Sequence, residues 1–269
     1  YPTRTETAIF ESIMDEVEAR VPKGAAVVEF GAGSQTKTPI LLEAISPAAY
    51  IPVDISGDYL EHSSTELQQR FPGIEVIPVV ADFARPFSLP GGIEHLPKLG
   101  FFPGSTIGNF IPWSATDLLR GFRGLLGTGS QLLIGMDRVK PVERLIAAYD
   151  DPQGVTAQFT LNLLSRINRE LNGDIPVDAF RHEARWNDIL SRIEIHLVAE
   201  RDVGFTVSGH DFEVARDTSI HIENSHKYGQ RGGRVILLAG GWTPIVEWTD
   251  PAGDFAEILA VAAPERFAP

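Results

Sequence analysis

Two spacings of hydrophobic residues alternate along the first half of this chain, one typical of helices and one typical of buried strands. Ile9, Ile13, Val17 and Val21 recur at helical spacing, which predicts a helix over residues 5–21 that covers a sheet. Short apolar runs predict strands at residues 25–30, 49–54 and 75–83, and the alternation continues through residues 101–110 and 131–137. Helices are expected at residues 39–45 and 58–71, and from a Ser114 cap to about Leu126. This alternation predicts a parallel, doubly wound α/β sheet.

The pattern changes after this region. Residues 141–172 predict a helical stretch, and residues 192–214 show strand-like segments with no helix between them. We therefore expect an inserted α+β domain over residues 138–226, while residues 1–137 and 227–269 form the first domain.

The chain then returns to the first domain. Residues 234–241 predict a short helix, and residues 243–263 predict two strands around a turn that contains proline and glycine. Two strands joined so closely pair antiparallel. We expect them to close the first sheet at one edge.

Charge, hydrophobic run length and cysteine content limit the expected partners and the expected compartment of the protein. The 269 residues include 36 acidic and 23 basic side chains, a net charge of -13, which disfavours nucleic acid and anionic membrane surfaces as partners. No apolar run reaches the roughly 20 residues of a membrane-spanning helix, and the start YPTRTE does not resemble a signal peptide. The absence of cysteine excludes disulfides and thiolate chemistry and is compatible with a reducing compartment, so we expect a cytoplasmic protein.

A glycine turn follows the first predicted strand. The segment VVEFGAGSQTKT brings Gly31 and Gly33 to a turn that opens a helix, where backbone amides approach a ligand closely. The dinucleotide pattern would need glycine at position 36, which is Thr36 here. The shortened turn suits a cofactor without a pyrophosphate, such as S-adenosylmethionine, better than a dinucleotide.

Acidic and aromatic residues end the next two predicted strands. Asp54 lies 21 residues after Gly33, where a carboxylate accepts hydrogen bonds from ribose hydroxyls. Asp82 and Phe83 end the third strand, and an acid beside an aromatic ring suits adenine. Because open α/β sheets bind ligands at the carboxyl ends of their strands, these residues predict a nucleoside-bearing cofactor.

Other interpretations of the same residues stay open. Alone, Asp82 would cap a helix and Phe83 would belong to the core, and a nicotinamide-dependent oxidoreductase or a noncatalytic nucleotide-binding protein would use the same sheet edge. His221 and His226 flank Glu223, but three such residues in one irregular segment do not specify a closed coordination site. We expect no metal.

Eight collinear segments resemble one family. They are VVEFGAGSQTKT, PVDIS, VADF, GSTIGN, AYDD, NRELN, IENS and WTDPAGDF, and together they span nearly the whole chain. The chain resembles the histidine Nα-methyltransferases of ergothioneine biosynthesis. The resemblance implies a class I methyltransferase fold with an inserted substrate-binding domain. It also implies that S-adenosylmethionine is used to trimethylate the α-amine of L-histidine to hercynine.

The resemblance also implies roles for individual residues. Cofactor contacts are implied for Gly31, Lys37, Asp54, Asp82 and Phe83. Substrate contacts are implied for Gly104, Asn109, Tyr149, Thr156, Glu223 and Ser225, with Asn109 and Tyr149 holding the reacting amino-acid end and Glu223 and Ser225 facing the imidazole.

Two departures from the family pattern bear on the substrate. Ile195 stands where a relative has a methionine against the imidazole, and the family carries a pocket-lining segment ahead of the position of Tyr1. Another amino-acid substrate therefore stays an alternative to histidine.

Overall fold

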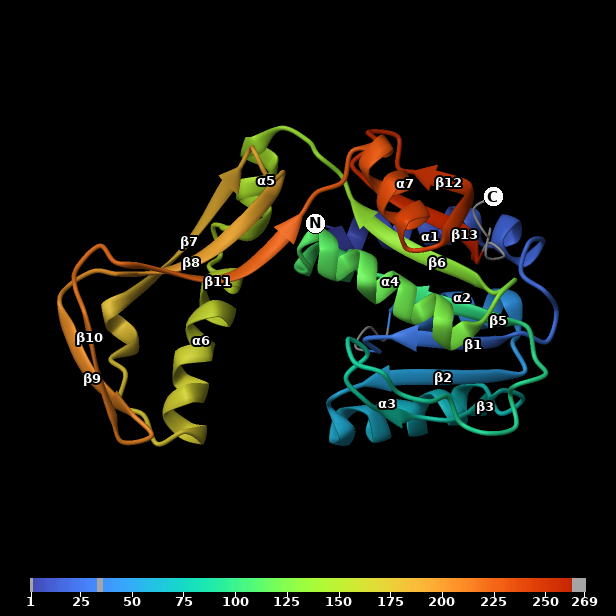
Figure 1. The fold of residues 1–269 in the computed structure, drawn as a ribbon, viewed down its shortest axis with the longest axis horizontal. Helices are drawn as coiled ribbons and strands as arrows, with labels where there is room; N and C mark the ends of the chain where they lie inside the picture. The colour runs from blue at the N-terminus through green and yellow to red at the C-terminus, as the bar shows by residue number, and fades with distance from the viewer. Residues whose placement is uncertain (1, 33–35, 263–269) are drawn as a thin grey trace, which may run out of the picture. The chain divides into compact units, whose positions relative to one another are not determined.

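The chain is built from two compact units. A computed structural model describes residues 2–32 and 36–262, and Gly33 of the predicted turn lies outside the described residues. Unit 1 consists of Tyr1–Arg138 and Tyr228–Pro269, and unit 2 consists of Val139–Lys227 (Figure 1). Each unit is described by itself below.

Unit 1 contains an eight-stranded sheet in the order β12-β13-β6-β5-β1-β2-β3, with the short β4 also paired to β2. The strands are β1 (Ala26–Phe30), β2 (Ala49–Asp54), β3 (Glu75–Val76), β4 (Val79–Val80), β5 (Lys98–Phe102), β6 (Gln131–Asp137), β12 (Trp242–Thr249) and β13 (Phe255–Ala262). All pairs from β6 to β3 are parallel, while β13 runs antiparallel to both β6 and β12. The predicted doubly wound sheet with an antiparallel edge pair is confirmed.

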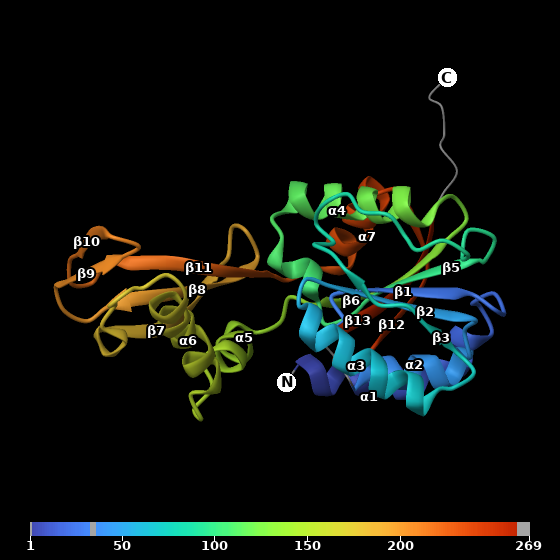
Figure 2. The ribbon, with the colours of Figure 1, turned by 90° about the horizontal axis from the view of Figure 1, so that it is seen from below.

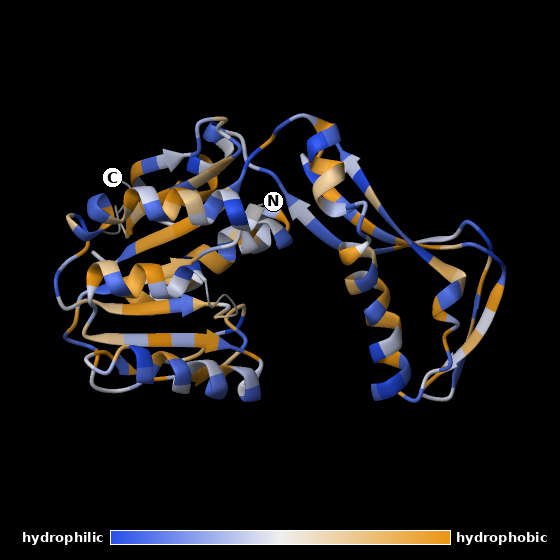
Figure 3. Ribbon diagram, turned by 180° about the vertical axis from the view of Figure 1, so that it is seen from behind, coloured by the Kyte–Doolittle hydropathy of each residue, from blue (hydrophilic) through white to orange (hydrophobic). Residues whose placement is uncertain are grey.

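Helices cover both faces of this sheet. They are α1 (Pro2–Glu18), α2 (Lys37–Ile45), α3 (Gly57–Arg70), α4 (Pro112–Leu126), α7 (Gln230–Ala239) and the 3-10 helix η1 (Thr106–Asn109). Figure 2 shows α1, α2 and α3 on one face and α4 and α7 on the other. The inner strands β1, β2, β5, β6 and β13 are largely hydrophobic (Figure 3) because both of their faces are buried.

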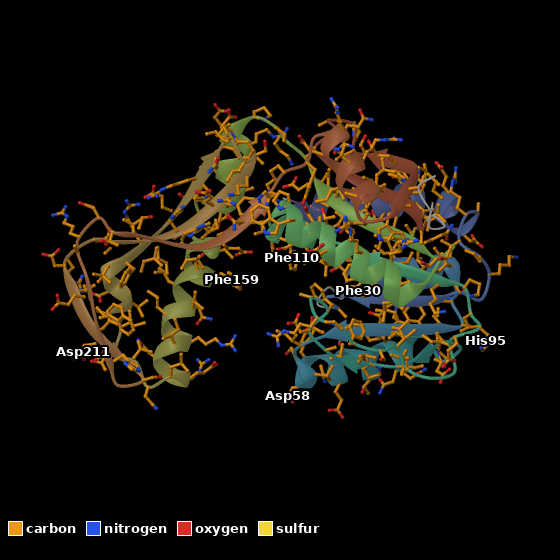
Figure 4. The ribbon with its side chains drawn as sticks, viewed as in Figure 1. Phe30, Asp58, His95, Phe110, Phe159 and Asp211 are labelled. Atoms are coloured by element: carbon orange, nitrogen blue, oxygen red, sulfur yellow. The ribbon has the colours of Figure 1, made fainter. Side chains whose placement is uncertain are left out.

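Successive residues of β1 point into two different cores. Val28 and Phe30 belong to the core beneath α4 and α7, and Val27 belongs to the core beneath α1 and α2. The Phe30 ring, labelled in Figure 4, stacks on Phe122 of α4 with centroids 3.6 Å apart. The stacking fixes the position of the last residue of β1. The residue that follows it, Gly31, therefore begins the turn at a well-defined place.

Several predicted boundaries were wrong. The strand expected within residues 101–110 is β5, which ends at Phe102, and the residues after it include the 3-10 helix η1. Residues 75–83 form two two-residue strands because Pro78 has no N–H to continue the ladder. Helix α4 is capped by Ile111 with Pro112 at its first turn, so Ser114 is not the cap. The expected helical stretch 141–172 is broken into two helices by residues 150–154, which include Pro152.

Unit 2 combines helices with antiparallel strands. Its elements are α5 (Val142–Tyr149), α6 (Val155–Glu170), η2 (Val177–Ala179), β7 (Phe180–Asn187), β8 (Arg192–Ala199), β9 (Val203–Val207), β10 (His210–Val214) and β11 (Ser219–His226). The three-stranded sheet has the order β11-β8-β7, and β9 with β10 forms a separate hairpin. Its apolar residues form two small clusters, one of which includes Ile195 and Tyr149.

The close approach of α7 to α4 depends on a glycine. A Cβ built at Gly240 would lie 2.5 Å from Leu119 Cβ, inside van der Waals contact. We predict that Gly240→Ala lowers the free energy of unfolding by about 1 to 3 kcal/mol, the cost of overpacking a core. Gly121→Ala on the exposed surface of α4, where a Cβ meets nothing within 4 Å, should instead be neutral or stabilising. Urea unfolding of both variants checks this, and equal effects would contradict the packing argument.

Candidate active site

The turn after β1 is tied to the end of β2. The N–H groups of Gly31 and Ala32 both donate to the carbonyl of Val53, at 2.9 and 3.2 Å. Gly31 has a φ of +77°, in the left-handed region, and a Cβ there would lie 3.4 Å from Phe83 Cε1. Glycine is favoured at this position by the backbone conformation, and its missing side chain leaves room beside the Phe83 ring.

Asp54 and Phe83 end neighbouring segments at the same edge. Asp54 is half-buried, and its Oδ1 accepts a hydrogen bond from the Ser56 N–H at 2.8 Å. The Phe83 ring is half-buried and packs against Phe102 and Phe110, with centroids 5.7 and 6.4 Å away. A strand-end carboxylate, an aromatic ring and an open glycine turn therefore lie together, and this set of groups fits a nucleoside.

Asp82 is engaged locally. Its Oδ1 accepts from the Ala84 N–H at 3.0 Å, and its Oδ2 lies 3.2 Å from the Arg85 guanidinium. Both side chains are well exposed. The role predicted for Asp82 at adenine stays a prediction.

Lys37 and Gly104 meet at a glutamate that the sequence analysis missed. Lys37 and Glu6 are buried and form an ion pair, and the other oxygen of Glu6 accepts from the Gly104 N–H at 2.5 Å. Gly104 has a φ of +80°. The sequence contains a signal for Glu6, because it lies three residues before Ile9 on the apolar face of the first helix.

A second carboxyl group lies in the same buried cluster. Glu257 of β13 is buried, and burial together with the negative charge of Glu6 raises the pKa of Glu257 well above its usual value. The raised pKa favours the neutral form of Glu257, and in that form Glu257 adds no second negative charge to the Glu6 and Lys37 pair. The cluster can therefore be buried without an unpaired charge.

The loop after β5 carries two of the predicted substrate residues. Gly104 and Asn109 are exposed, and Asn109 is the last residue of η1. Between them, Ser105 has a φ of +55°, and its hydroxyl accepts from the Asp137 N–H at 2.8 Å. The loop is thus held in place while the Asn109 side chain stays accessible.

In unit 2, Tyr149, Ser225 and Lys227 form one hydrogen-bonded group. The Tyr149 and Ser225 hydroxyl oxygens are 2.8 Å apart, and Lys227 Nζ donates to them at 2.6 and 2.7 Å. The Tyr149 carbonyl, at the end of α5, lies 2.8 Å from the Nε2 of His182 on β7. Sequence reasoning found Tyr149 and Ser225 but not Lys227.

Glu223 shares the face of β11 that carries Ser225, because residues two apart in a strand point to the same side. Ile195 is its cross-strand partner on β8, and a bulge interrupts β11 between His221 and Glu223. The pKa of the Glu223 carboxyl is raised above its usual value by loss of solvation, and the positive charge of Lys227 offsets only part of that rise.

Thr156 has a local role at the start of α6. Its N–H and its hydroxyl both donate to Asp151 Oδ1, at 2.9 and 2.8 Å. These bonds hold the pKa of Asp151 down at about 2. Thr156 therefore organises a helix start, and the substrate contact implied for it stays a prediction.

The described part of the chain shows neither a metal-binding cluster nor a membrane-spanning helix. Residues 2–32 and 36–262 contain no group of three or more His, Cys, Asp or Glu residues that could hold a metal ion. No helix within these ranges has the length and apolar character needed to cross a membrane.

Glu29 lies buried below the glycine turn. Its Oε2 accepts from the Thr38 and Tyr50 hydroxyls at 2.7 and 2.6 Å, while burial raises its pKa from 4.5 to about 7. The folded state binds the Glu29 proton more tightly than the unfolded state does. The protonated carboxyl therefore contributes to the free energy of unfolding, and this contribution is fully present below pH 4.5 and is lost as pH rises through about 7.

We predict that the stability of the wild-type protein relative to Glu29→Gln falls by about 2 to 3 kcal/mol between pH 5 and pH 8. The amide that replaces the carboxyl group does not titrate. Any effect of the amide itself on the free energy of unfolding is therefore independent of pH. Urea unfolding at both pH values measures the difference, with the exposed Glu61→Gln as the control. A difference independent of pH would mean that Glu29 is ionised throughout.

Comparison with known proteins agrees with this geometry. The family described as histidine-specific methyltransferase, SAM-dependent, matches residues 1–262. The chain is similar to histidine N-alpha-methyltransferase of Mycobacterium tuberculosis (strain CDC 1551 / Oshkosh), with 39% identity over 97% of this chain and 82% of the relative. It is also similar to ergothioneine biosynthesis protein 1 of Neurospora crassa, with 28% identity over 93% of this chain and 29% of the relative.

Solved structures with low sequence identity to this chain share its fold. The CcbJ methyltransferase from Streptomyces caelestis matches with a TM-score of 0.55 at 13% identity, covering 94% of this chain and 96% of the other. The predicted class I methyltransferase fold is confirmed. Since the family model matches nearly the whole sequence, the chain belongs to the family of histidine-specific, S-adenosylmethionine-dependent methyltransferases.

Proposed function

We propose that this protein methylates the α-amino group of L-histidine, up to the trimethylated betaine hercynine, as a step of ergothioneine biosynthesis. The observation that carries the proposal is the placement of Glu223 and Ser225 on one face of β11. A neutral imidazole has one N–H donor and one nitrogen acceptor. A carboxylate that accepts and a hydroxyl that donates match both, and the names of the relatives support the same substrate.

The cofactor half of the function belongs to unit 1. When bound, S-adenosylmethionine supplies an activated methyl group. The Asp54 carboxylate has lone pairs beyond the one used by the Ser56 N–H, and these accept hydrogen bonds from ribose hydroxyls. Phe83 offers an aromatic face for adenine, and the Gly31 turn lets the backbone approach the ligand.

Lys37 takes part in this binding through the cluster around Glu6. Its ammonium is committed to the buried ion pair with Glu6, so the residue supports the position of the glycine turn and of Gly104. A direct contact between Lys37 and the methionine part of the cofactor stays a proposal. Such a contact would share the ammonium between the ligand and Glu6.

For methyl transfer, the protein needs to orient the two reactants and to bind the amine in its neutral form. An α-amino group has a reference pKa of about 7.7 to 8.0, so it loses its proton easily near neutral pH. Well-oriented reactants reach effective molarities of about 10⁵ to 10⁸ M, which makes a covalent residue unnecessary. Asn109 and Tyr149 are proposed to hold the amine and carboxylate of the amino acid.

We predict that Asp54→Asn weakens binding of S-adenosylhomocysteine by about 1.5 to 3 kcal/mol, the range for a hydrogen bond to a charged group. The exposed Asp58→Asn on α3, which makes the same charge change nearby, should bind normally. Titration calorimetry measures both affinities. An unchanged affinity in folded Asp54→Asn would remove Asp54 from the cofactor site.

We predict that Glu223→Ala lowers kcat/KM for histidine by about 1.5 to 3 kcal/mol, roughly 10- to 150-fold, because one imidazole edge loses its partner. Any activity toward leucine should fall less, since an apolar side chain no longer desolvates a carboxylate.

The matched control is Glu213→Ala on β10, an exposed carboxylate on another strand of unit 2. Initial rates with each amino acid test the pair of variants. Equal losses for histidine and leucine in Glu223→Ala would show that the residue is structural, and the histidine assignment would lose its main physical support.

A further inference from the structure

Lys227 is a buried cation placed against two hydroxyls of the proposed substrate site, that of Ser225 at the imidazole and that of Tyr149 at the amino-acid end. Its side chain is 3% exposed, and its ammonium donates to both Tyr149 and Ser225. The same ammonium lies 4.5 Å from the centroid of the Tyr149 ring, within range of a cation–π interaction. Burying an ammonium is costly unless it is well partnered, and the two hydroxyls are among the partners of Lys227.

Counting hydrogens shows what Lys227 does to the two hydroxyls. Each hydroxyl oxygen accepts one hydrogen from the ammonium, and one hydroxyl hydrogen is used in the bond between Tyr149 and Ser225. Either hydroxyl can donate in this bond, and because a phenol is the stronger acid, the arrangement in which Tyr149 donates to Ser225 is favoured. Both lone pairs of Ser225 are then occupied, and its own hydrogen stays available. Ser225 becomes a donor that no longer accepts.

Lys227 also balances the charge of Glu223. Glu223, Ser225 and Lys227 follow one another at alternate positions, two in β11 and one just beyond it. Loss of solvation raises the pKa of the Glu223 carboxyl, and the attraction between the ammonium and the carboxylate offsets part of that rise. A ligand at this face therefore meets one acceptor and one donor with no excess negative charge.

We propose that Lys227 is the specificity-determining residue that adapts this face to a neutral imidazole and makes it reject cationic side chains. It acts through Ser225 and Tyr149 as a positioning residue, and its charge opposes a second cation. The inference rests on the proposed function in that the imidazole is taken as the ligand. Without the ammonium, Ser225 regains a lone pair and Glu223 is left without its balancing charge, which suits arginine or lysine.

The test compares the binding of L-histidine and L-arginine to the full chain saturated with S-adenosylhomocysteine. Lys227→Met keeps much of the aliphatic stem and removes the ammonium, and Lys227→Gln is a second uncharged variant in case the first fails to fold. We expect histidine affinity to fall about 10- to 100-fold in either variant, the effect of losing hydrogen bonds to a charged group. Arginine affinity should stay equal or rise.

The conservative Lys227→Arg retains the charge and should preserve the rejection of L-arginine, a result that a merely structural role would not give. Unchanged affinity for S-adenosylhomocysteine shows that unit 1 is intact. An arginine-to-histidine affinity ratio equal to the wild-type ratio in a folded uncharged variant would overturn the proposal. Failure of the wild-type protein to methylate histidine would instead refute the proposed function, while the affinity ratio would still decide the role of Lys227.

Discussion

The buried ion pair between Glu6 and Lys37 is the constraint on which the cofactor unit depends. It connects α1, the start of α2 after the glycine turn, and the loop after β5, because Glu6 also binds the Gly104 N–H. Removing one member of a buried pair costs about 3 to 5 kcal/mol, since the other charge is left unpaired. Three segments far apart in sequence are thus held in one arrangement at the sheet edge where ligands bind.

The two units stabilise buried ammonium groups in different ways. Lys37 is paired with a carboxylate in unit 1, and the pKa of the neighbouring Glu257 carboxyl is raised by burial and by the charge of Glu6. In unit 2, the ammonium of Lys227 donates to two hydroxyl groups. The first arrangement connects α1, the start of α2 and the Gly104 loop, and it serves as a support. The second leaves a hydroxyl hydrogen available and is suited to recognising a ligand.

The sequence was sufficient to predict the parallel sheet with its antiparallel edge pair. It also identified the candidate site residues that lie within local motifs. The strands at Ala49–Asp54 and Gln131–Asp137 were predicted with their observed limits because continuous apolar runs mark them clearly. The break between β3 and β4 at Pro78 was missed because the residues around it form a continuous apolar run. The missing N–H of one proline does not change that hydrophobic pattern. Lys227 was missed because its partner Tyr149 lies 78 residues away, and no local pattern reports such a contact. Glu6 stands on the apolar face of the first helix, but its partner Lys37 lies 31 residues away, so the local pattern marks the residue without revealing the ion pair. The roles of the predicted site residues stay predictions.

The most direct measurement of the central claim is mass spectrometry of a reaction that offers all twenty amino acids together with an isotopically labelled S-adenosylmethionine. The account predicts label on histidine alone, in products that carry up to three methyl groups on the α-nitrogen. Label on a different amino acid, or on the imidazole ring of histidine, would contradict it.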